Sequence, residues 1–195
     1  VLESPRVLLP AVRAVEIDRM IRFAADLKQK AVLYGVHEGY RAAGMLKSSG
    51  LPVIVNAKWP EKGRDSDPEE TEAYRTLELR EKAPSTPAEL ERAGVLFAFS
   101  SEGIDAPADL LRNVRASGAI KALTLNAAEI FGVADRLGSI EKGKIANLIV
   151  TKGDLFQEKP EVKHVIIDGA KYEPLPEQAA PAGGGPQGGR RPGGV

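Results

Sequence analysis

The sequence has no cysteine and only 2 histidines among its 195 residues. Disulfide scaffolds, thiolate zinc sites, iron–sulfur clusters and cysteine nucleophiles are therefore excluded, and any chemistry must use oxygen or imidazole groups. The 27 basic residues equal the 27 acidic ones, so no net field attracts phosphate or an anionic membrane. Uninterrupted apolar runs, such as residues 95–99, are far shorter than the ~18 to 20 residues that span a bilayer. We therefore expect neither nucleic acid nor a membrane as the main partner.

The chain begins at Val1 instead of a methionine. This start predicts a fragment or a processed chain. The pattern of a signal peptide is absent, although such a peptide would be lost together with the true start. We therefore leave the localisation open between the cytoplasm and, if a signal peptide has been lost, the periplasm or secretion.

The composition changes sharply after Tyr172, where prolines alternate with seven glycines between positions 183 and 194. This composition predicts that residues 174–195 form a disordered tail. Arg190 and Arg191 lie in a glycine-rich element of the kind that contacts RNA, but a single copy is far short of the repeated arrays that do so. We interpret the tail as inert.

Up to residue 136, helical and strand-like patterns alternate. Buried strands are predicted by apolar runs at residues 31–36, 51–56 and 95–99, and helices at 17–27, 38–49, 71–80, 107–115 and 119–131. A further helix is expected to begin with Thr86 as its N-cap and Pro87 at its first position, and the 71–80 helix to be started by residues 65–68. Continuous apolar strands that alternate with helices are typical of a parallel sheet, so the predicted fold class is α/β.

After residue 137 the chain changes to short strands joined by glycine turns. Residues 146–151 and 162–168 alternate in part between apolar and polar side chains, which predicts an antiparallel pair with one covered face.

The most distinctive residues lie between 123 and 169. They are a Thr124-Leu-Asn126 helix, a Leu137-Gly-Ser-Ile-Glu141 turn, a Gly143-Lys144 step, a strand at 145–150 and a closing Val165-Ile-Ile-Asp-Gly169. In this order and at this spacing, the combination closely resembles the carboxy-terminal signature of the amidohydrolase superfamily, particularly its imidazolonepropionase-like branch. Asn147 stands where many members have aspartate.

Residues 34–43, 51–55, 84–90 and 94–103 are similar to the sixth, seventh and eighth barrel units of such an enzyme. The resemblance implies a partial TIM-type (β/α) barrel over residues 1–136, followed by strands of a small β-sandwich over 137–173. It also implies that a strand's worth of residues is missing near Arg13 to Glu16, where the fifth strand is expected between two helical segments. A second contraction is expected between Val114 and Ile120.

Members of this family hydrolyse carbon–nitrogen or carbon–oxygen bonds with water activated on one or two divalent metals, most often zinc. The usual ligands are a His-any-His pair on the first strand, histidines on strands five and six and an aspartate on strand eight. This sequence has no His-any-His pair, and the family register places Tyr34 in the histidine position of strand six. We therefore expect no bound metal in this chain alone.

The two histidines are interpreted as structural. The register displaces His37 from the ligand position to the start of the next helix, with metal binding as the alternative interpretation. His164 lies beside Lys163 in a late strand and is expected to face solvent.

Glu102 is the candidate catalytic residue, because it follows a buried strand at the position where relatives have the aspartate of a serine-aspartate-glycine sequence. Its extra methylene moves the carboxylate by roughly an ångström, enough to disturb a geometry-sensitive step. The alternative is an ordinary acidic residue in a turn at Gly103.

Two functions follow as hypotheses. The first is an amidohydrolase-type hydrolase of non-peptide carbon–nitrogen bonds that acts on a small amide or cyclic substrate and is present here as a fragment or in catalytically incomplete form. The second is a non-catalytic binding or assembly module derived from the same barrel. Because a half barrel exposes sheet edges and apolar faces, we also expect homo-oligomers.

Overall fold

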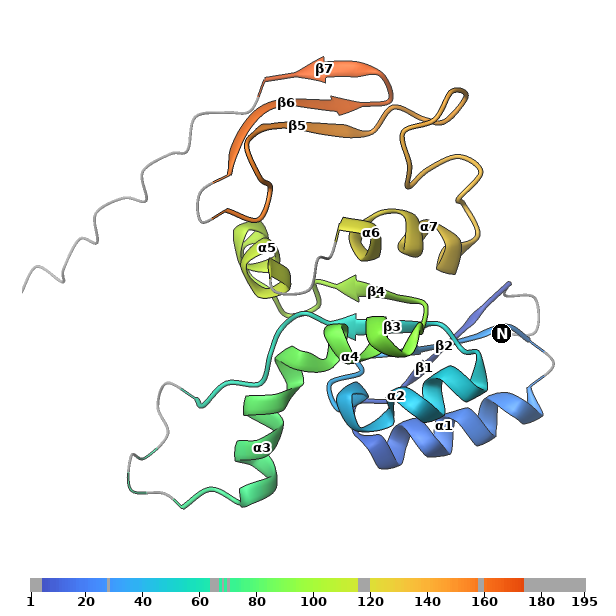
Figure 1. Ribbon diagram of the computed structural model, residues 1–195, viewed down its shortest axis with the longest axis vertical. Helices are drawn as coiled ribbons and strands as arrows, with labels where there is room; N and C mark the ends of the chain where they lie inside the picture. The colour runs from blue at the N-terminus through green and yellow to red at the C-terminus, as the bar shows by residue number, and fades with distance from the viewer. Residues whose placement is uncertain are drawn as a thin grey trace, which may run out of the picture.

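The computed structural model describes residues 5–27, 29–63, 67, 69, 71–115, 120–157 and 160–173 (Figure 1). The elements are, in chain order, β1 (Val7–Pro10), α1 (Ala14–Asp26), β2 (Ala31–Tyr34), α2 (Gly39–Ser49), β3 (Val53–Asn56), α3 (Tyr74–Lys82), the 3₁₀ helix η1 (Ala83–Ser85), α4 (Thr86–Ala93), β4 (Phe97–Ser100), α5 (Pro107–Val114), α6 (Ile120–Leu123), α7 (Leu125–Phe131), β5 (Leu148–Lys152), β6 (Glu161–Ile167) and β7 (Ala170–Tyr172).

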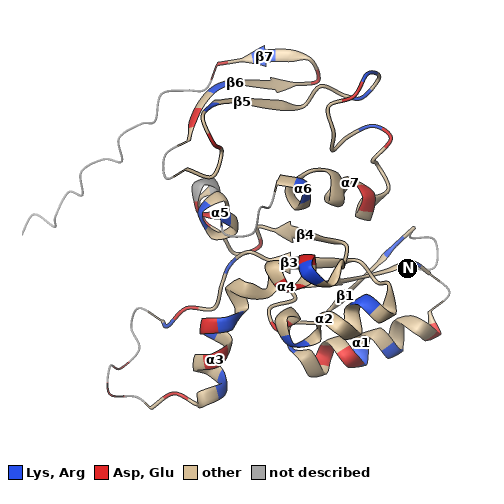
Figure 2. Cartoon of the chain, in the orientation of Figure 1, with Lys and Arg blue, Asp and Glu red and all other residues tan. Residues whose placement is uncertain are grey.

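The first sheet has four parallel strands in the order β1-β2-β3-β4. The predicted α/β class with a parallel sheet is therefore confirmed, and the arrangement is consistent with part of an amidohydrolase barrel. None of the four strands contains a charged residue, whereas charged side chains lie along α1 and α3 (Figure 2). The strands are short, but they are uncharged, as is typical of strands that are covered on both faces of a parallel sheet.

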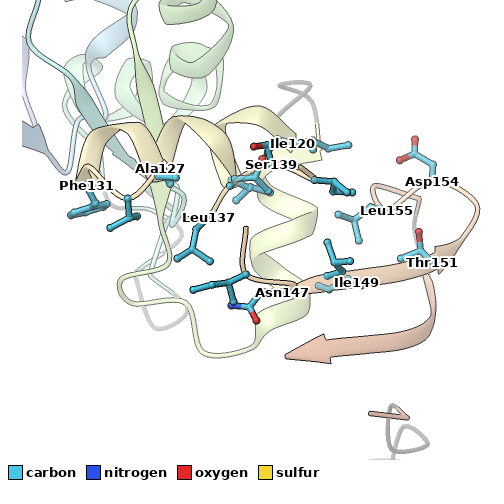
Figure 3. Close-up of a pocket in the computed structure, with 18 of the residues that line it drawn as sticks. Ile120, Ala127, Phe131, Leu137, Ser139, Asn147, Ile149, Thr151, Asp154 and Leu155 are labelled. Atoms are coloured by element: carbon cyan, nitrogen blue, oxygen red, sulfur yellow. The ribbon is translucent and has the colours of Figure 1, made fainter. Parts of the chain in front are cut away.

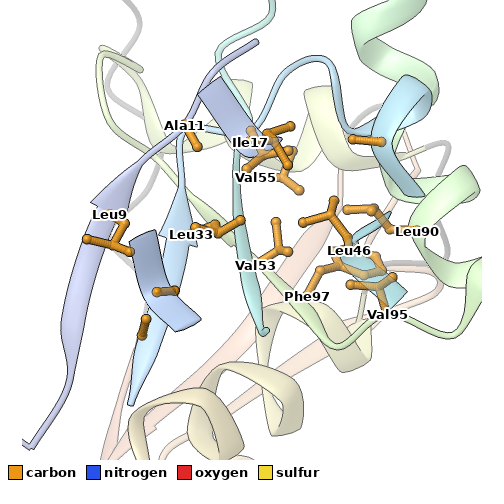
Figure 4. Close-up of a cluster of buried hydrophobic side chains, with 14 of the residues drawn as sticks. Leu9, Ala11, Ile17, Leu33, Leu46, Val53, Val55, Leu90, Val95 and Phe97 are labelled. Atoms are coloured by element: carbon orange, nitrogen blue, oxygen red, sulfur yellow. The ribbon is translucent and has the colours of Figure 1, made fainter. Parts of the chain in front are cut away.

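The two faces of this sheet are covered by different helices. The outer face carries Leu33, Val53 and Phe97, which pack with buried residues of α1, α2 and α4, such as Ile17, Leu46 and Leu90 (Figure 4). The inner face carries Val32, Ile54 and Ala98, which pack against Ile130 of α7. Because one helix from each of the three crossovers, α1, α2 and α4, contributes to the outer face, the sheet is wound on one side only, as in a barrel.

One sequence prediction was wrong at the start of the chain. The fifth-strand segment is not missing near Arg13 but lies earlier, as β1 (Val7–Pro10), and pairs in parallel with β2 from Val7↔Ala31 to Pro10↔Tyr34. The prediction failed because the apolar run at residues 7–10 is too short for its periodicity to distinguish a strand from a helix. The proline at its end is compatible with an edge strand, where one unpaired N–H position is tolerated.

Two helix starts also differ from prediction. Helix α3 begins at Tyr74 instead of Thr71, and most of the proposed starter at 65–68 lies outside the described residues. Thr86 is not an N-cap, because α4 continues directly from η1 with Ser85 in the capping position. The Thr86 hydroxyl instead donates to the His37 carbonyl at 2.7 Å and accepts the Tyr40 N–H at 3.2 Å, which joins α4 to the start of α2.

The predicted helix at 119–131 is divided at Thr124 into α6 and α7. The Thr124 hydroxyl donates to the Ile120 carbonyl at 2.7 Å, a local bond that competes with regular helix geometry. The predicted contraction before Ile120 falls largely on residues 116–119, which lie outside the described residues.

The second sheet is antiparallel, with the order β5-β6-β7, so the predicted antiparallel pair is confirmed and is extended by β7. A β-sandwich stays a prediction, as do the domain boundaries and self-association. The tail at 174–195 lies outside the described residues. Among the helices of the described ranges, none combines the length and apolarity needed to cross a membrane.

Candidate functional site

The carboxy ends of β1 to β4 meet at one edge of the parallel sheet. The register pairs Pro10 with Tyr34 and Asn56 with Ser100, at the last residue of each strand. Tyr34 pairs with Ile54, and side chains that pair across parallel strands share a face, so these four residues lie on the inner face. We call Pro10, Tyr34, Asn56 and Ser100 the strand-end residues.

The strand-end residues are polar but uncharged, apart from the apolar proline. The Asn56 side-chain oxygen accepts the Lys58 N–H at 2.8 Å, which turns the chain as it leaves β3. The Ser100 carbonyl accepts the Ala57 N–H at 3.0 Å, whereas the Ser100 Oγ is buried and has no hydrogen-bond partner in the described part of the chain. A buried hydroxyl without a partner is unfavourable and marks a place where another group can bind.

Behind this edge, a buried carboxylate joins the loops that follow β1 and β2. Glu38, whose side chain is 2% exposed, accepts the Ala14 N–H at the start of α1 at 2.8 Å. The N–H groups of His37 and Glu38 both donate to the Val12 carbonyl, at 3.2 and 3.0 Å. Arg75 of α3 lies 3.7 Å from the same carboxylate. Glu38 is therefore engaged in holding the loops and is not presented to the inner face.

His37 lies immediately before α2, as predicted, and its ring lies beyond the end of β3, near Trp59. The ring centroid is 6.1 Å from that of Trp59, a residue that packs against the outer-face core. Burial lowers the pKa of His37, and hydrogen bonding to the backbone of Asn56 and Lys58 offsets part of that effect. The Nε2 atom is buried without a partner among the described residues.

This burial makes the stability of the fold depend on pH. The unfolded imidazole titrates near 6.5, while the folded one stays neutral to lower pH. Between these two values the unfolded chain binds more protons, so stability falls as the pH drops below about 6.5. We expect the thermal midpoint of the wild type to fall more between pH about 7.5 and 5.5 than that of His37→Gln.

His164→Gln is the matched control for this prediction, because His164 lies on β6 in the other sheet. It should retain the acid sensitivity of the wild type. An equally steep acid response in His37→Gln would contradict the assignment to His37.

Glu102, the candidate catalytic residue, lies in the turn that follows β4. Its side chain is exposed and forms no hydrogen bond or ion pair within the described ranges. Lys58 reaches the same turn from β3, so that a Cβ at Gly103 would lie 3.0 Å from the Lys58 Cδ. Two residues of opposite charge, Lys58 and Glu102, therefore lie at the turn after β4.

The residues at this edge do not fit the metal centre that the family resemblance implies. Throughout the described residues, no three histidine, aspartate or glutamate side chains lie close enough together to hold a metal ion. The strand-end residues supply neither imidazole nor carboxylate. His37, whose ring bonds the backbone of Asn56 and Lys58, belongs to no group of three potential metal ligands among the described residues. His164 lies opposite Val150 in the antiparallel sheet, away from this edge, and its Nδ1 is buried, so it does not simply face solvent as expected.

The signature residues have structural roles. The Asn126 amide donates to the Phe97 carbonyl at 2.9 Å and so fixes α7 to β4. Gly138 lies against the start of α7, where an added Cβ would be 3.0 Å from the Leu125 Cα. The Asn147 side chain accepts the Asp168 N–H at 2.8 Å, which joins the start of β5 to the end of β6. These contacts explain why the residues occur together at fixed spacing.

A groove of about 910 Å³ lies between α6, α7 and β5. Its walls are mainly apolar, with Ile120, Phe131 and Ile149 among them, and Asp154 is its single charged lining residue (Figure 3). The groove lacks the groups needed for hydrolysis, since it has one carboxylate and no imidazole.

Sequence reasoning found Glu102, His37 and Tyr34 but missed Asn56, Ser100 and Glu38. The available signal for Asn56 and Ser100 is that a polar residue closes an otherwise apolar strand. For Glu38 it is an acidic residue directly after a buried strand and before a helix.

The comparisons with known proteins agree with this fold. The model of the amidohydrolase family matches residues 63–171, which is more than half of the chain. An amidohydrolase from Thermotoga maritima MSB8 is 30% identical and superposes with a TM-score of 0.69, over 87% of this chain and 44% of its own. The chain thus spans less than half the length of that structure.

Two further solved structures share the fold at lower identity. A prolidase complexed with N-methylphosphonate-L-proline is 19% identical, with a TM-score of 0.63 over 87% of this chain and 45% of its own. A Xaa-Pro dipeptidase with methionine in its active site is 18% identical, with a TM-score of 0.56 over 87% and 54%. With the family match over residues 63–171, the chain belongs to the amidohydrolase family.

Proposed function

We propose that this chain forms the four-strand half of an amidohydrolase barrel that binds a small amide or cyclic molecule at its strand ends, and that it is catalytically incomplete by itself. The observation that carries the proposal is the edge where β1 to β4 end: it has the position of an amidohydrolase site but no set of metal ligands. Hydrolysis of a non-peptide carbon–nitrogen bond would need groups from beyond the described residues.

Glu102 is the group of this chain that would take part in such a reaction. Its carboxylate follows β4 at the rim and is exposed and unpaired among the described residues, so it is available to accept a proton from water. Lys58 reaches the same turn and brings a positive charge to it.

A non-catalytic binding module is the second candidate function. It is favoured by the strand-end residues, because Tyr34 and Ser100 bring hydroxyl groups to positions where hydrolysis requires imidazole or carboxylate. The two candidates differ in whether any bound amide is turned over.

Hydrolysis by the chain can be measured with a chromogenic anilide and a cyclic imide in the presence of excess zinc. We expect no turnover above the uncatalysed rate, because a single carboxylate without a held metal ion does not activate water sufficiently. Turnover that falls by about 10² to 10⁴ in Glu102→Gln would show that the chain is catalytically complete and that Glu102 is its essential carboxylate. Turnover that is unchanged in this variant would contradict the role of Glu102.

A further inference from the structure

The strand-end residues share one face but lie at two levels, because Tyr34 pairs with Ile54, two residues before Asn56. Pro10 and Tyr34 are direct partners on β1 and β2, and Asn56 and Ser100 are direct partners on β3 and β4. Neighbouring parallel strands are about 4.8 Å apart, so one small molecule can contact two or three of these side chains together. Deeper on the same face, Val32, Ile54 and Ala98 are closed off by Ile130 of α7, which provides an apolar floor.

The chemistry of this set is unsuitable for a divalent cation. Zinc is bound in proteins by thiolate, imidazole and carboxylate groups, whereas these positions offer a proline ring, a phenol, an amide and a hydroxyl. The Asn56 side-chain oxygen, which could have been a weak ligand, already accepts the Lys58 N–H at 2.8 Å.

The same groups are well suited to donate hydrogen bonds. With its oxygen engaged, Asn56 has its NH₂ group left to donate, and Ser100 has a buried hydroxyl without a partner in the described part of the chain. Tyr34, packed against the inner-face cluster, adds a second hydroxyl. Lys58 and Glu102 at the turn after β4 contribute one charge of each sign, so this pair favours neither a cation nor an anion.

We propose that the strand ends form a metal-free site for an uncharged small molecule, whose carbonyl oxygen accepts hydrogen bonds from the directly paired Ser100 and Asn56, while Tyr34 lines the deeper level of the site. This inference rests on the proposed function, since it specifies what binds at the same edge. It goes further by stating that this half of the barrel contributes no ligand to a metal even when the rest of a barrel is present.

The first test uses zinc alone, titrated into the full chain in competition with a chromophoric chelator. We expect no stoichiometric binding by the wild type. The double variant Pro10→His with Tyr34→His places two imidazoles on directly paired positions and should gain zinc affinity by about tenfold or more. The single variant Tyr34→His is the matched control and should not gain it.

Two outcomes of this titration would overturn the inference. One is a zinc ion bound by the wild type and weakened by Glu102→Gln. The other is a folded double variant, checked by circular dichroism, that binds no more zinc than the wild type, because this would show that the paired positions do not share a face.

The second test uses 2-pyrrolidinone, a neutral cyclic amide, and acetate as its charged counterpart, with binding followed by amide chemical shifts. We expect 2-pyrrolidinone to bind more tightly than acetate and to perturb signals around Tyr34, Asn56 and Ser100. Loss of one hydrogen bond in Ser100→Ala should weaken binding about fivefold. Ser101→Ala changes the neighbouring exposed serine and should leave binding unchanged.

Equal binding of 2-pyrrolidinone by the Ser100→Ala and wild-type proteins, or tighter binding of acetate, would overturn the inference. This result is distinct from failure of the proposed function, which would appear as hydrolysis of an amide by the chain. Binding without hydrolysis supports both.

Discussion

Gly138→Ala is expected to lower the free energy of unfolding by about 2 to 5 kcal/mol. Two effects add at this position. Gly138 has φ of +91°, where a side chain costs about 1 to 2 kcal/mol. Its Cβ would also lie 2.7 Å from the Ala128 Cβ and 3.0 Å from the Leu125 Cα, and a backbone atom of α7 cannot move aside cheaply. Urea denaturation followed by circular dichroism measures the change.

Gly143→Ala separates the two effects. Gly143 has nearly the same backbone angle, with φ of +93°, but nothing lies within 4 Å of its added Cβ. Its free energy of unfolding should fall only by the conformational cost of the side chain, about 1 to 2 kcal/mol. Equal losses in the two variants would show that the turn at Gly138 does not press against α7.

Gly39→Ala should also destabilise the protein, by about 1 to 3 kcal/mol, for a purely steric reason. Gly39 is the first residue of α2, and its added Cβ would lie 2.6 Å from the Thr86 Cγ2 and 2.9 Å from the Val36 Cγ1. The same Thr86 hydroxyl bonds the His37 carbonyl, so the threonine cannot rotate away without losing that bond. The free energy of unfolding in urea again reports the effect.

Gly44→Ala, in the middle of the same helix, should have the opposite sign. No atom lies within 4 Å of its added Cβ, so the gain in helix propensity of about 0.5 to 1 kcal/mol is not opposed. If both variants were stabilised, the close contact between α2 and α4 would not exist in solution.

The sequence predicted the elements whose signals are local. The apolar runs at β2, β3 and β4 and the helix that ends before Gly50 are recognisable because composition and punctuation agree there. The family signature has a different basis: Asn126, Gly138 and Asn147 each make a specific contact that joins two elements of the fold.

What the sequence did not predict depends on distant partners. Thr86 has the local pattern of an N-cap, yet its hydroxyl bonds Tyr40 of α2 and His37 just before it, which lie more than 45 positions earlier. Asn56 and Ser100 lie far apart in the chain and become neighbours only through the register of β3 with β4. The imidazolonepropionase-like branch stays a prediction, because the strand-end residues differ from its ligand pattern.

The bond between Asn126 and Phe97 also bears on aggregation. The backbone N–H groups of Val7 and Ala11 donate towards β2. By alternation, the backbone groups of Leu8 and Pro10 point to the open edge of β1, and Pro10 has no N–H that could bond another strand there. On the opposite edge, the carbonyls of Leu96 and Ser100 accept hydrogen bonds from Val53 of β3 and from Ala57 in the loop after it. By alternation, the backbone groups of Phe97 point to the open edge of β4, where the Phe97 carbonyl already accepts a hydrogen bond from Asn126. Each open edge thus lacks one free backbone donor or acceptor that a further strand would need for pairing. The residue that attaches α7 therefore also protects the sheet against indefinite edge-to-edge growth.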